Sequence, residues 1–381
     1  MKRVVTFSIM CVMAMAQESL REQLGTSDEE RHMQGELRAG YIDGDKSAAA
    51  IGGHIHFDTP SFNGLQIGAV IYAIAPIQGS NSDFFGSYDG GFAFLGESYI
   101  KYSDTTNMLQ VGRMSIDTPH ADSDDIRMVP NYFEGVHYQK SWDNVNIEAG
   151  YVTKMAGWEN GGDIKKFVRL NEVFGINKKI DGMFFTGIGY EDENNGAFLW
   201  YYHIDQIANV LYGELSHTFI WNKFSLLASL QFDRATDTGD GLIGNLDSKT
   251  FGIFLETTYQ NISLQLAANK EFGNTPSMSS FGGGAFFTSM EDLTIDAVDA
   301  KKARSFVLGA SYSYNESIDF GITYGNFRAK EKSQFDTDEI DLYATMQIFG
   351  VESEIVYASI NDKLPNGEDR DIFRIIIKKS F

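Results

Sequence analysis

Hydrophobic and polar residues alternate along most of the chain, from residue 34 to the carboxyl end. In the segment 224–233 the even positions read Phe-Leu-Ala-Leu-Phe, and Ser225, Ser229, Gln231 and Asp233 fall between them. The same period of two runs through 34–43, 48–58, 262–271 and 306–314. Alternating segments of about ten residues are typical of strands that cross a membrane in a β-barrel. Strands of soluble sandwiches also alternate but are shorter, usually about 5–6 residues.

The links between these segments predict an all-β fold, a transmembrane antiparallel β-barrel of eighteen strands over residues 34–381. Short and longer links alternate, as expected when one rim carries periplasmic turns and the other extracellular loops. An even number of strands leaves both chain ends on the periplasmic side. The short links are 59–63, 104–106, 140–144, 192–195, 221–223, 260–261, 315–317 and 349–350. The other links are 44–47, 75–93, 114–131, 156–180, 205–208, 234–248, 272–302, 327–338 and 361–370.

Large aromatic residues stand at or next to the strand ends at every short link. Amphipathic rings favour the headgroup level of a membrane, so we expect an aromatic girdle at this rim. The last strand, DIFRIIIKKSF, also alternates and ends the chain on Phe381, which resembles the terminal signal read by the barrel-assembly machinery. The residues of the expected girdle are Phe57, Tyr102, Trp142, Tyr190, Trp221, Tyr259, Tyr314, Phe349 and Phe381.

The amino end has the layout of a secretory signal peptide. Lys2 and Arg3 precede an uncharged apolar run over residues 4–15, and the small-x-small sequence Ala-Met-Ala ends at Ala16. We therefore expect residues 1–16 to be removed on export. The run is too short to span a bilayer. Residues 17–33 are polar and lack a period, and we interpret them as a periplasmic amino-terminal segment, either a tail or a plug-like segment at the entry of the lumen.

Charge and cysteine content narrow the class of protein. Removing Lys2 and Arg3 from the 31 basic residues leaves 29 against 52 acidic ones, a net charge of −23. We do not expect a chain this acidic to bind nucleic acid through a basic face. Its single cysteine, Cys11, lies in the expected signal peptide, so the mature chain can form no disulfide and no thiolate metal site. Gly-x-Ser-x-Gly, His-Glu-x-x-His and phosphate-loop motifs are absent from the sequence.

The segment 112–135, GRMSIDTPHADSDDIRMVPNYFEG, resembles the OprD-type outer-membrane porins of Gram-negative bacteria. The similarity rests on a series of short matches within this third outward link. FGGGAFFTS at 281–289 is also similar to that family. The matching residues are Gly112-Arg113, Asp117-Thr118-Pro119, Asp125-Ile126-Arg127-Met128, Pro130 and Phe133-Glu134-Gly135.

The resemblance implies an 18-stranded barrel whose third and seventh outer loops fold inward and narrow the pore. It also implies diffusion of small, often carboxylate-bearing solutes past a track of basic side chains. Arg127 lies among several aspartates, and two interpretations remain open: these charges set a transverse field across the constriction, or they only tie the loop to the wall. The residues in matching loop positions, and so the candidates for the pore constriction, are Asp117, Asp124, Asp125, Arg127 and Tyr132.

Alternation predicts which charged side chains face the lumen. Arg38, Lys101, Arg374 and Lys378 would form the basic track, and closure of the barrel would bring three of them, Arg38, Arg374 and Lys378, onto one wall. Inward acids are at least as numerous, which argues for weak ion selectivity. Arg113 shares parity with outward residues, and we expect it at the rim. The inward acids are Glu36, Glu97, Glu148, Glu256, Glu352 and Glu354.

The pattern as a whole predicts a porin of the cell outer membrane that acts by passive diffusion, without a cofactor, and is not an enzyme. Expected partners are membrane lipid and lipopolysaccharide, the barrel-assembly machinery and small polar solutes, with the barrel a monomer or a weak trimer. A barrel hydrolase is the first alternative, with His54, His56 and inward acids at its site. These two histidines share a strand face, but no third ligand lies near, so we expect no metal. A soluble exported β-protein is the second alternative.

Overall fold

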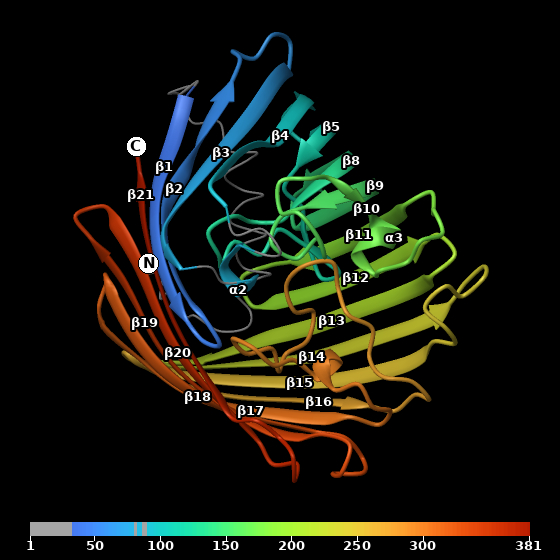
Figure 1. Cartoon of the computed structure of the whole chain (residues 1–381), viewed down its shortest axis with the longest axis vertical. Helices are drawn as coiled ribbons and strands as arrows, with labels where there is room; N and C mark the ends of the chain where they lie inside the picture. The colour runs from blue at the N-terminus through green and yellow to red at the C-terminus, as the bar shows by residue number, and fades with distance from the viewer. Residues whose placement is uncertain (1–32, 80–81, 86–89) are drawn as a thin grey trace.

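The computed structural model describes residues 33–79, 82–85 and 90–381. Eighteen long strands form one antiparallel sheet, in which each strand pairs with its neighbour in sequence. The first and last strands also pair, so the sheet closes into a barrel, and Figure 1 looks obliquely into it. The barrel strands are β1 (Met33–Asp43), β2 (Ser47–Asp58), β3 (Leu65–Gly79), β4 (Phe92–Ser103), β5 (Asn107–Met114), β8 (Tyr132–Trp142), β9 (Val145–Ala156), β11 (Met183–Glu191), β12 (Asn195–Ile204), β13 (Ala208–Trp221), β14 (Phe224–Asp237), β15 (Asp247–Tyr259), β16 (Ile262–Glu271), β17 (Arg304–Asn315), β18 (Ile318–Arg328), β19 (Asp336–Ile348), β20 (Val351–Asp362) and β21 (Arg370–Ser380).

The remaining described elements are short and lie in the long links. They are β6 (Asp117–Thr118), β7 (Ala121–Asp122), β10 (Val168–Arg169), α2 (Ser82–Phe85), α3 (Leu170–Val173) and the 3-10 turn η1 (Ile295–Ala297). None of the described helices is long and apolar enough to cross a membrane. The expected signal peptide, and the amino-terminal segment up to residue 32, lie outside the described residues.

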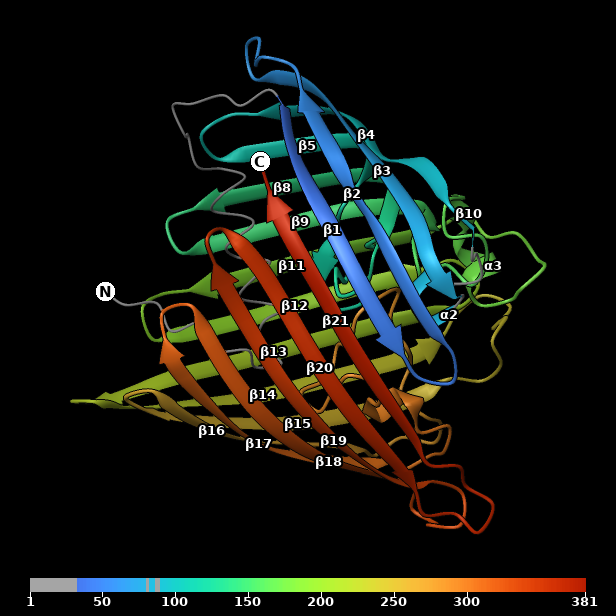
Figure 2. The ribbon, with the colours of Figure 1, turned by 60° about the vertical axis from the view of Figure 1, so that its left-hand side comes forward.

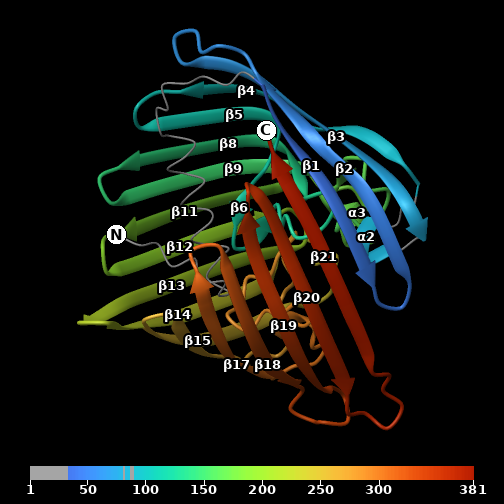
Figure 3. The same ribbon diagram turned by 90° about the vertical axis from the view of Figure 1, so that its left-hand side faces the viewer.

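The predicted fold class and strand count are confirmed, and most strand ends fall within two residues of the prediction. The short links at 104–106, 260–261 and 349–350 match the predicted bounds. Left-handed backbone at Asp143, Asn222, Gln260 and Phe349 allows several of these turns to be this short. Figures 2 and 3 show the strands strongly tilted, as barrel closure requires.

The two faces of the wall differ in the way that the alternation predicts. On β16 and β17 the outward Leu264 and Leu308 are 52% and 45% exposed, whereas the inward Ser263 and Val307 are 6% and 0% exposed. All nine residues of the expected girdle are exposed, from 40% at Tyr102 to 96% at Phe349. The outer face is therefore an apolar band, and the polar side chains face a lumen.

A charge introduced at an outward apolar position near the middle of a strand should destabilise the barrel far more than a charge at the neighbouring inward position. Leu266→Arg should lower the free energy of unfolding from lipid vesicles by about 2–4 kcal/mol, because the new charge would face hydrocarbon. Gln265→Arg, one residue away on the inward face, is the matched control and should have a much smaller effect. Urea titration of the folded barrel measures both. Equal losses would contradict the assignment of the two faces.

Candidate functional site

Two long loops, L3 (residues 115–131) and L7 (residues 272–303), are joined to each other by backbone hydrogen bonds. The amide of Asp122 donates to the carbonyl of Phe281 over 3.0 Å, and the amide of Phe281 donates to the carbonyl of His120 over 3.0 Å. Ala121 and Phe281 thus form a parallel bridge, and both are buried. This strand-like pairing makes the two loops one unit.

L3 has internal structure of its own, which fixes its charged tip. β6 and β7 form a two-stranded hairpin in which Asp117 pairs with Asp122. Beyond the hairpin the amide of Ser123 donates to the carbonyl of Ile116 over 2.8 Å. Asp124 then adopts a positive φ of 42°, which turns the chain toward the wall. The three residues after it carry the contacts described next.

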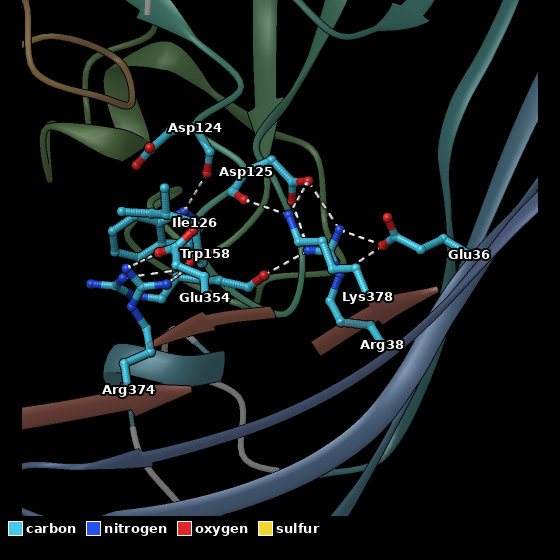
Figure 4. A network of polar contacts seen from close by, with 10 residues as sticks. Glu36, Arg38, Asp124, Asp125, Ile126, Trp158, Glu354, Arg374 and Lys378 are labelled. Carbon is cyan, nitrogen blue, oxygen red and sulfur yellow. Dashed lines mark hydrogen bonds and ion pairs between the residues drawn. The ribbon is translucent and has the colours of Figure 1, made fainter. Parts of the chain in front are cut away.

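The seam between β1 and β21 holds the tip of L3. Arg38 and Lys378 are direct cross-strand partners on the inner face. The Arg38 guanidinium donates to both carboxylate oxygens of Asp125, at 2.7 and 2.9 Å, and to the carbonyl of Arg127 at 2.7 Å. The Lys378 ammonium lies 3.1 Å from the same carboxylate. Figure 4 shows Arg38 and Lys378 reaching Asp125 from neighbouring strands, with Glu36 closing the other side of Arg38.

A second cluster joins L3, L7 and β21 around Arg374. The Arg374 guanidinium donates to both oxygens of Glu291 in L7, at 2.9 and 2.8 Å, and to the carbonyl of Ile126 in L3 at 2.8 Å. Arg127 donates to the same Glu291 carboxylate over 3.1 Å. Arg374 also pairs with Glu354 of β20 at 2.7 Å. Arg374 and Glu291 are both buried, so each compensates a charge that would otherwise be costly.

These contacts set the charge state of the two loop carboxylates. Burial would raise the pKa of Asp125, but Arg38 and Lys378 outweigh it and hold that pKa well below the ordinary range. Burial would also raise the pKa of Glu291, but Arg374 and Arg127 outweigh it and lower that pKa to about 2. Both groups therefore stay ionised in mild acid. The ion pairs are lost only as the pH falls through these lowered values.

Further contacts attach the loops to β14, across the barrel from the seam, and to β19. His120 of L3 lies 2.7 Å from the buried carboxylate of Asp233 on β14. Gln231, also on β14, donates to the carbonyl of Ala285 in L7 over 2.7 Å. On β19 the Glu339 carboxylate accepts the amides of Asp292 and Leu293, both at 2.8 Å. The loops are thus held by β1, β14, β19 and β21, on several sides of the lumen.

A cavity of about 340 Å³ lies between these loops and the wall of β16–β21. Asp124 and Glu159 contribute carboxylates to it, and Arg374 is the only basic side chain among its described lining residues. Burial raises the pKa of Asp124 to about 6 and, with the charge of Asp124 beside it, that of Glu159 to about 8. The charge facing this cavity therefore changes across the neutral range.

The structure brings most of the predicted site residues together, but not all of them. Asp124, Asp125 and Arg127 lie within the clusters described above. Asp117 lies deeper, in the β6–β7 hairpin, where burial and the nearby Glu148 carboxylate raise its pKa to about 6. Tyr132 is 2% exposed at the start of β8, packs against Tyr72 with ring centroids 5.9 Å apart, and is not among the described residues that line the cavity.

The residues of the predicted basic track also fall into two groups, those at the seam and one apart from it. Arg38, Arg374 and Lys378 meet at the seam, as closure predicts. Lys101 lies apart from them on β4, close to the rim of short links, with its ammonium 5.8 Å from the Tyr99 ring centroid. Arg113 lies at the outer side of the long-loop rim, bonded to Glu134 and 4.2 Å from the Phe167 ring.

The two histidines of the alternative hypothesis have separate partners. His54 lies against the ring of Tyr72, with centroids 4.8 Å apart, while His56 bonds to Asp58 and Tyr99, each at 3.1 Å. Within the described ranges, no group of three or more His, Cys, Asp or Glu side chains is placed to hold a metal ion.

Several contact residues are invisible to sequence reasoning. Glu291, Asp233 and Gln231 carry the main ties of L7 and L3 to each other and to the wall, yet none belongs to the motif of L3. The only available signal was indirect: a buried inward arginine such as Arg374 requires a carboxylate. The sequence does not indicate which carboxylate this is, because Glu291 lies 83 residues from Arg374 in the chain and meets it only in the folded barrel.

Comparison with protein families gives a match to the model described as "outer membrane porin, OprD family", over residues 81–327. Comparison with curated proteins gives no match.

Solved structures with this fold are known at low sequence identity. Pseudomonas aeruginosa OpdK, crystallised with vanillate, superposes with a TM-score of 0.80 at 17% identity, covering 92% of this chain and 98% of that one. Acinetobacter baumannii OccAB3 superposes with a TM-score of 0.79 at 15% identity, covering 92% and 98%. P. aeruginosa OccD3 superposes with a TM-score of 0.78 at 16% identity, covering 93% and 91%. These likenesses establish the fold.

Removing the carboxylate that joins the two loops should loosen them. Glu291→Gln leaves Arg374 and Arg127 buried without their shared counter-charge, which should cost about 3 kcal/mol in the free energy of unfolding. It should also open L7 to protease. Asp292→Asn is the matched control, since its ion pair with Arg370 is more exposed and should contribute less than about 1 kcal/mol. Similar losses in both variants would show that the buried cluster does not hold the loops.

Proposed function

The chain belongs to the OprD family of outer membrane porins, and we propose that it conducts small hydrophilic solutes by passive diffusion through a lumen narrowed by L3 and L7. Porins of this family are channels of the outer membrane and not enzymes. The observation that carries the proposal is the attachment of both loops to inner-face side chains, Arg38 and Arg374 among them. A loop held at that position reduces the cross-section open to a solute.

The pore would select by size and by the charges that face the solute. A constriction works through its diameter and through the side chains that replace water around the permeating group. Here the narrowed path would run past the cavity of about 340 Å³ that Asp124, Glu159 and Arg374 line. The solute gradient would drive passage, with no cofactor and no energy source.

Carboxylate-bearing solutes are one class that the proposal includes. The relative OpdK was crystallised with vanillate, which is a carboxylate. In this chain, however, Arg38, Lys378, Arg127 and Arg374 already bond to Asp125 or Glu291. A solute carboxylate would have to compete with these internal partners, so we propose weak ion selectivity rather than strong anion preference. The two interpretations of the loop charges are then both part of the proposal, because the same pairs tie the loop and set the local field.

The two chain ends have roles in export and assembly in the proposal. Residues 1–16 would direct export and be removed, and residues 17–33 would precede the barrel on the periplasmic side, although β1 already begins at Met33. Phe381 would present the terminal signal to the assembly machinery. It extends the seam, because its amide donates to the carbonyl of Gly35 over 2.9 Å, and its side chain is 59% exposed. Membrane lipid would surround the barrel, which would be a monomer or a weak trimer.

A single introduced cysteine tests the loop-narrowed path, because Cys11 is the only cysteine of the full sequence and would be lost with the signal peptide. Ser289→Cys lines the cavity, so a water-soluble thiol reagent should lower single-channel conductance in planar bilayers. Leu308→Cys, outward on β17, is the control and should show no change. Steady current that is insensitive to modification at residue 289 would contradict a path beside L7. Absence of current altogether would favour a plugged barrel such as a membrane hydrolase.

Ion preference should depend on pH through the carboxylates of the cavity. Because the pKa values of Asp124 and Glu159 are raised to about 6 and about 8, both become negative as the pH rises from 5 to 9. The reversal potential under a salt gradient should therefore shift toward cation preference over this range. Glu159→Gln should remove the alkaline part of the shift, and Asp124→Asn the part near pH 6.

Asp104→Asn serves as the control for this titration. Hydrogen bonds from Thr106 and Asn107 lower the pKa of Asp104 to about 2, and the residue lies in a short link at the other rim. Its charge is constant over the tested range. A flat profile in the unmodified protein, or a shift toward anions, would show that these carboxylates do not face the pore.

A further inference from the structure

Five adjacent strands carry a basic side chain on the outer face of the barrel, at the long-loop rim. We call this set the rim belt: Arg234 on β14, Lys249 on β15, Lys270 on β16, Arg304 on β17 and Arg328 on β18. Each shares strand parity with exposed apolar residues such as Leu230, Phe251 and Leu308, so the belt faces away from the lumen. It is basic although the chain as a whole carries a net charge of −21.

The strand register places like charges directly beside one another. Arg234 pairs with Lys249, and Lys270 pairs with Arg304, which pairs in turn with Arg328. Directly opposite residues of an antiparallel pair have Cβ atoms about 4.5–5.5 Å apart, and like charges there destabilise the sheet. Elsewhere in the barrel opposite charges face each other, as Arg113 and Glu134 do. An anion beside the basic residues would offset the cost of their like charges.

The protein supplies part of that counter-charge but not all of it. Asp336 lies 2.8 Å from Arg328, and Asp247 lies 3.7 Å from Lys249. Asp247 also interacts electrostatically with Arg234. Among the described residues, no carboxylate pairs with Lys270 or Arg304 within 4.0 Å, and both side chains are exposed. Positive charge is thus left open to the surroundings at the middle of the belt.

Aromatic rings stand directly below the belt, toward the middle of the barrel wall. Phe232, Phe251 and Phe306 each lie one outward position further in than Arg234, Lys249 and Arg304. The rings of Phe232 and Phe251 are 5.0 Å apart. Phe272 lies level with the belt, beside Lys249, and its ring is 4.8 Å from the Lys270 ammonium. Below this level the outer face is apolar. The belt therefore lies where hydrocarbon gives way to headgroups.

We propose that the rim belt binds the phosphorylated headgroup of a lipid in the outward leaflet of the outer membrane. Arginine and lysine form strong charge-assisted hydrogen bonds with phosphate oxygens. Basic side chains at the headgroup level bind anionic lipids, and the rings beneath would contact the acyl chains. A free anion would contact only the basic side chains, whereas a lipid would contact both the basic side chains and the aromatic rings below them. The site is separate from the solute path, since it lies on the opposite face of the wall.

Native mass spectrometry of the detergent-solubilised barrel with diphosphorylated lipid A tests this inference. The double variant Lys270→Gln/Arg304→Gln should bind about twenty-fivefold more weakly, because each cation near an anionic headgroup contributes roughly fivefold. Lipid A stripped of its phosphates should bind the unmodified barrel at least as weakly as the variant binds the intact lipid, because the variant keeps three of the five cations. Inorganic phosphate should not compete at equal concentration.

Two controls separate this result from misfolding and from a failed pore. Lys140→Gln removes an outward lysine at the rim of short links and should leave lipid binding unchanged. In lipid-free detergent the double variant should unfold at the same or a higher temperature, since a like-charge pair is gone, and its conductance should stay normal. Equal lipid binding by the double variant and the unmodified protein would overturn the proposal, as would equal binding of the phosphate-free lipid.

Discussion

The closing pair of strands, β1 and β21, is the constraint on which the rest of the structure depends. Inside a bilayer no water is available to bond the amides and carbonyls of an open sheet edge, so a spanning sheet must close. Eight directly paired positions, from Glu36 with Ser380 to Asp43 with Phe373, satisfy these groups at the seam. Because side chains alternate across the wall, the register at this seam also fixes which residues face the lumen beside one another.

The arrangement of the loops follows from that register. Pairing of Arg38 with Lys378 places two cations on the inner wall, and Arg374, four residues earlier on β21, faces the same side. Buried charges of one sign need partners, and L3 and L7 provide them through Asp125 and Glu291. In the proposed pore, the ion pairs that hold the loops would also reduce the net charge that a solute meets. Selectivity and loop position would then depend on one group of contacts.

Strands and turns could be predicted from the sequence because both depend on local pattern. A period of two, as in 224–233, reports which face of a strand is apolar, and polar or glycine-containing breaks mark the turns. The family resemblance located the charged tip of L3 for a similar reason, since it lies within 24 contiguous residues. Tyr132 and Lys101 show the limit of that approach, because parity and motif position do not say how deeply a side chain packs. Partners such as Glu291 and Asp233 could not be predicted, since they meet L3 and β21 only after the sheet has closed.

A disulfide across the seam tests closure and register most directly, because the mature chain would contain no other cysteine. Ala39 and Ile377 are direct partners of β1 and β21, so Ala39→Cys with Ile377→Cys should oxidise to an intramolecular disulfide in the folded barrel. The linked chain should then migrate differently from the reduced chain on a denaturing gel. Ala39→Cys with Ile375→Cys, two residues out of register, should link poorly. Preferential linkage of the offset pair, or of neither pair in a folded sample, would contradict the closed barrel and the wall that it builds.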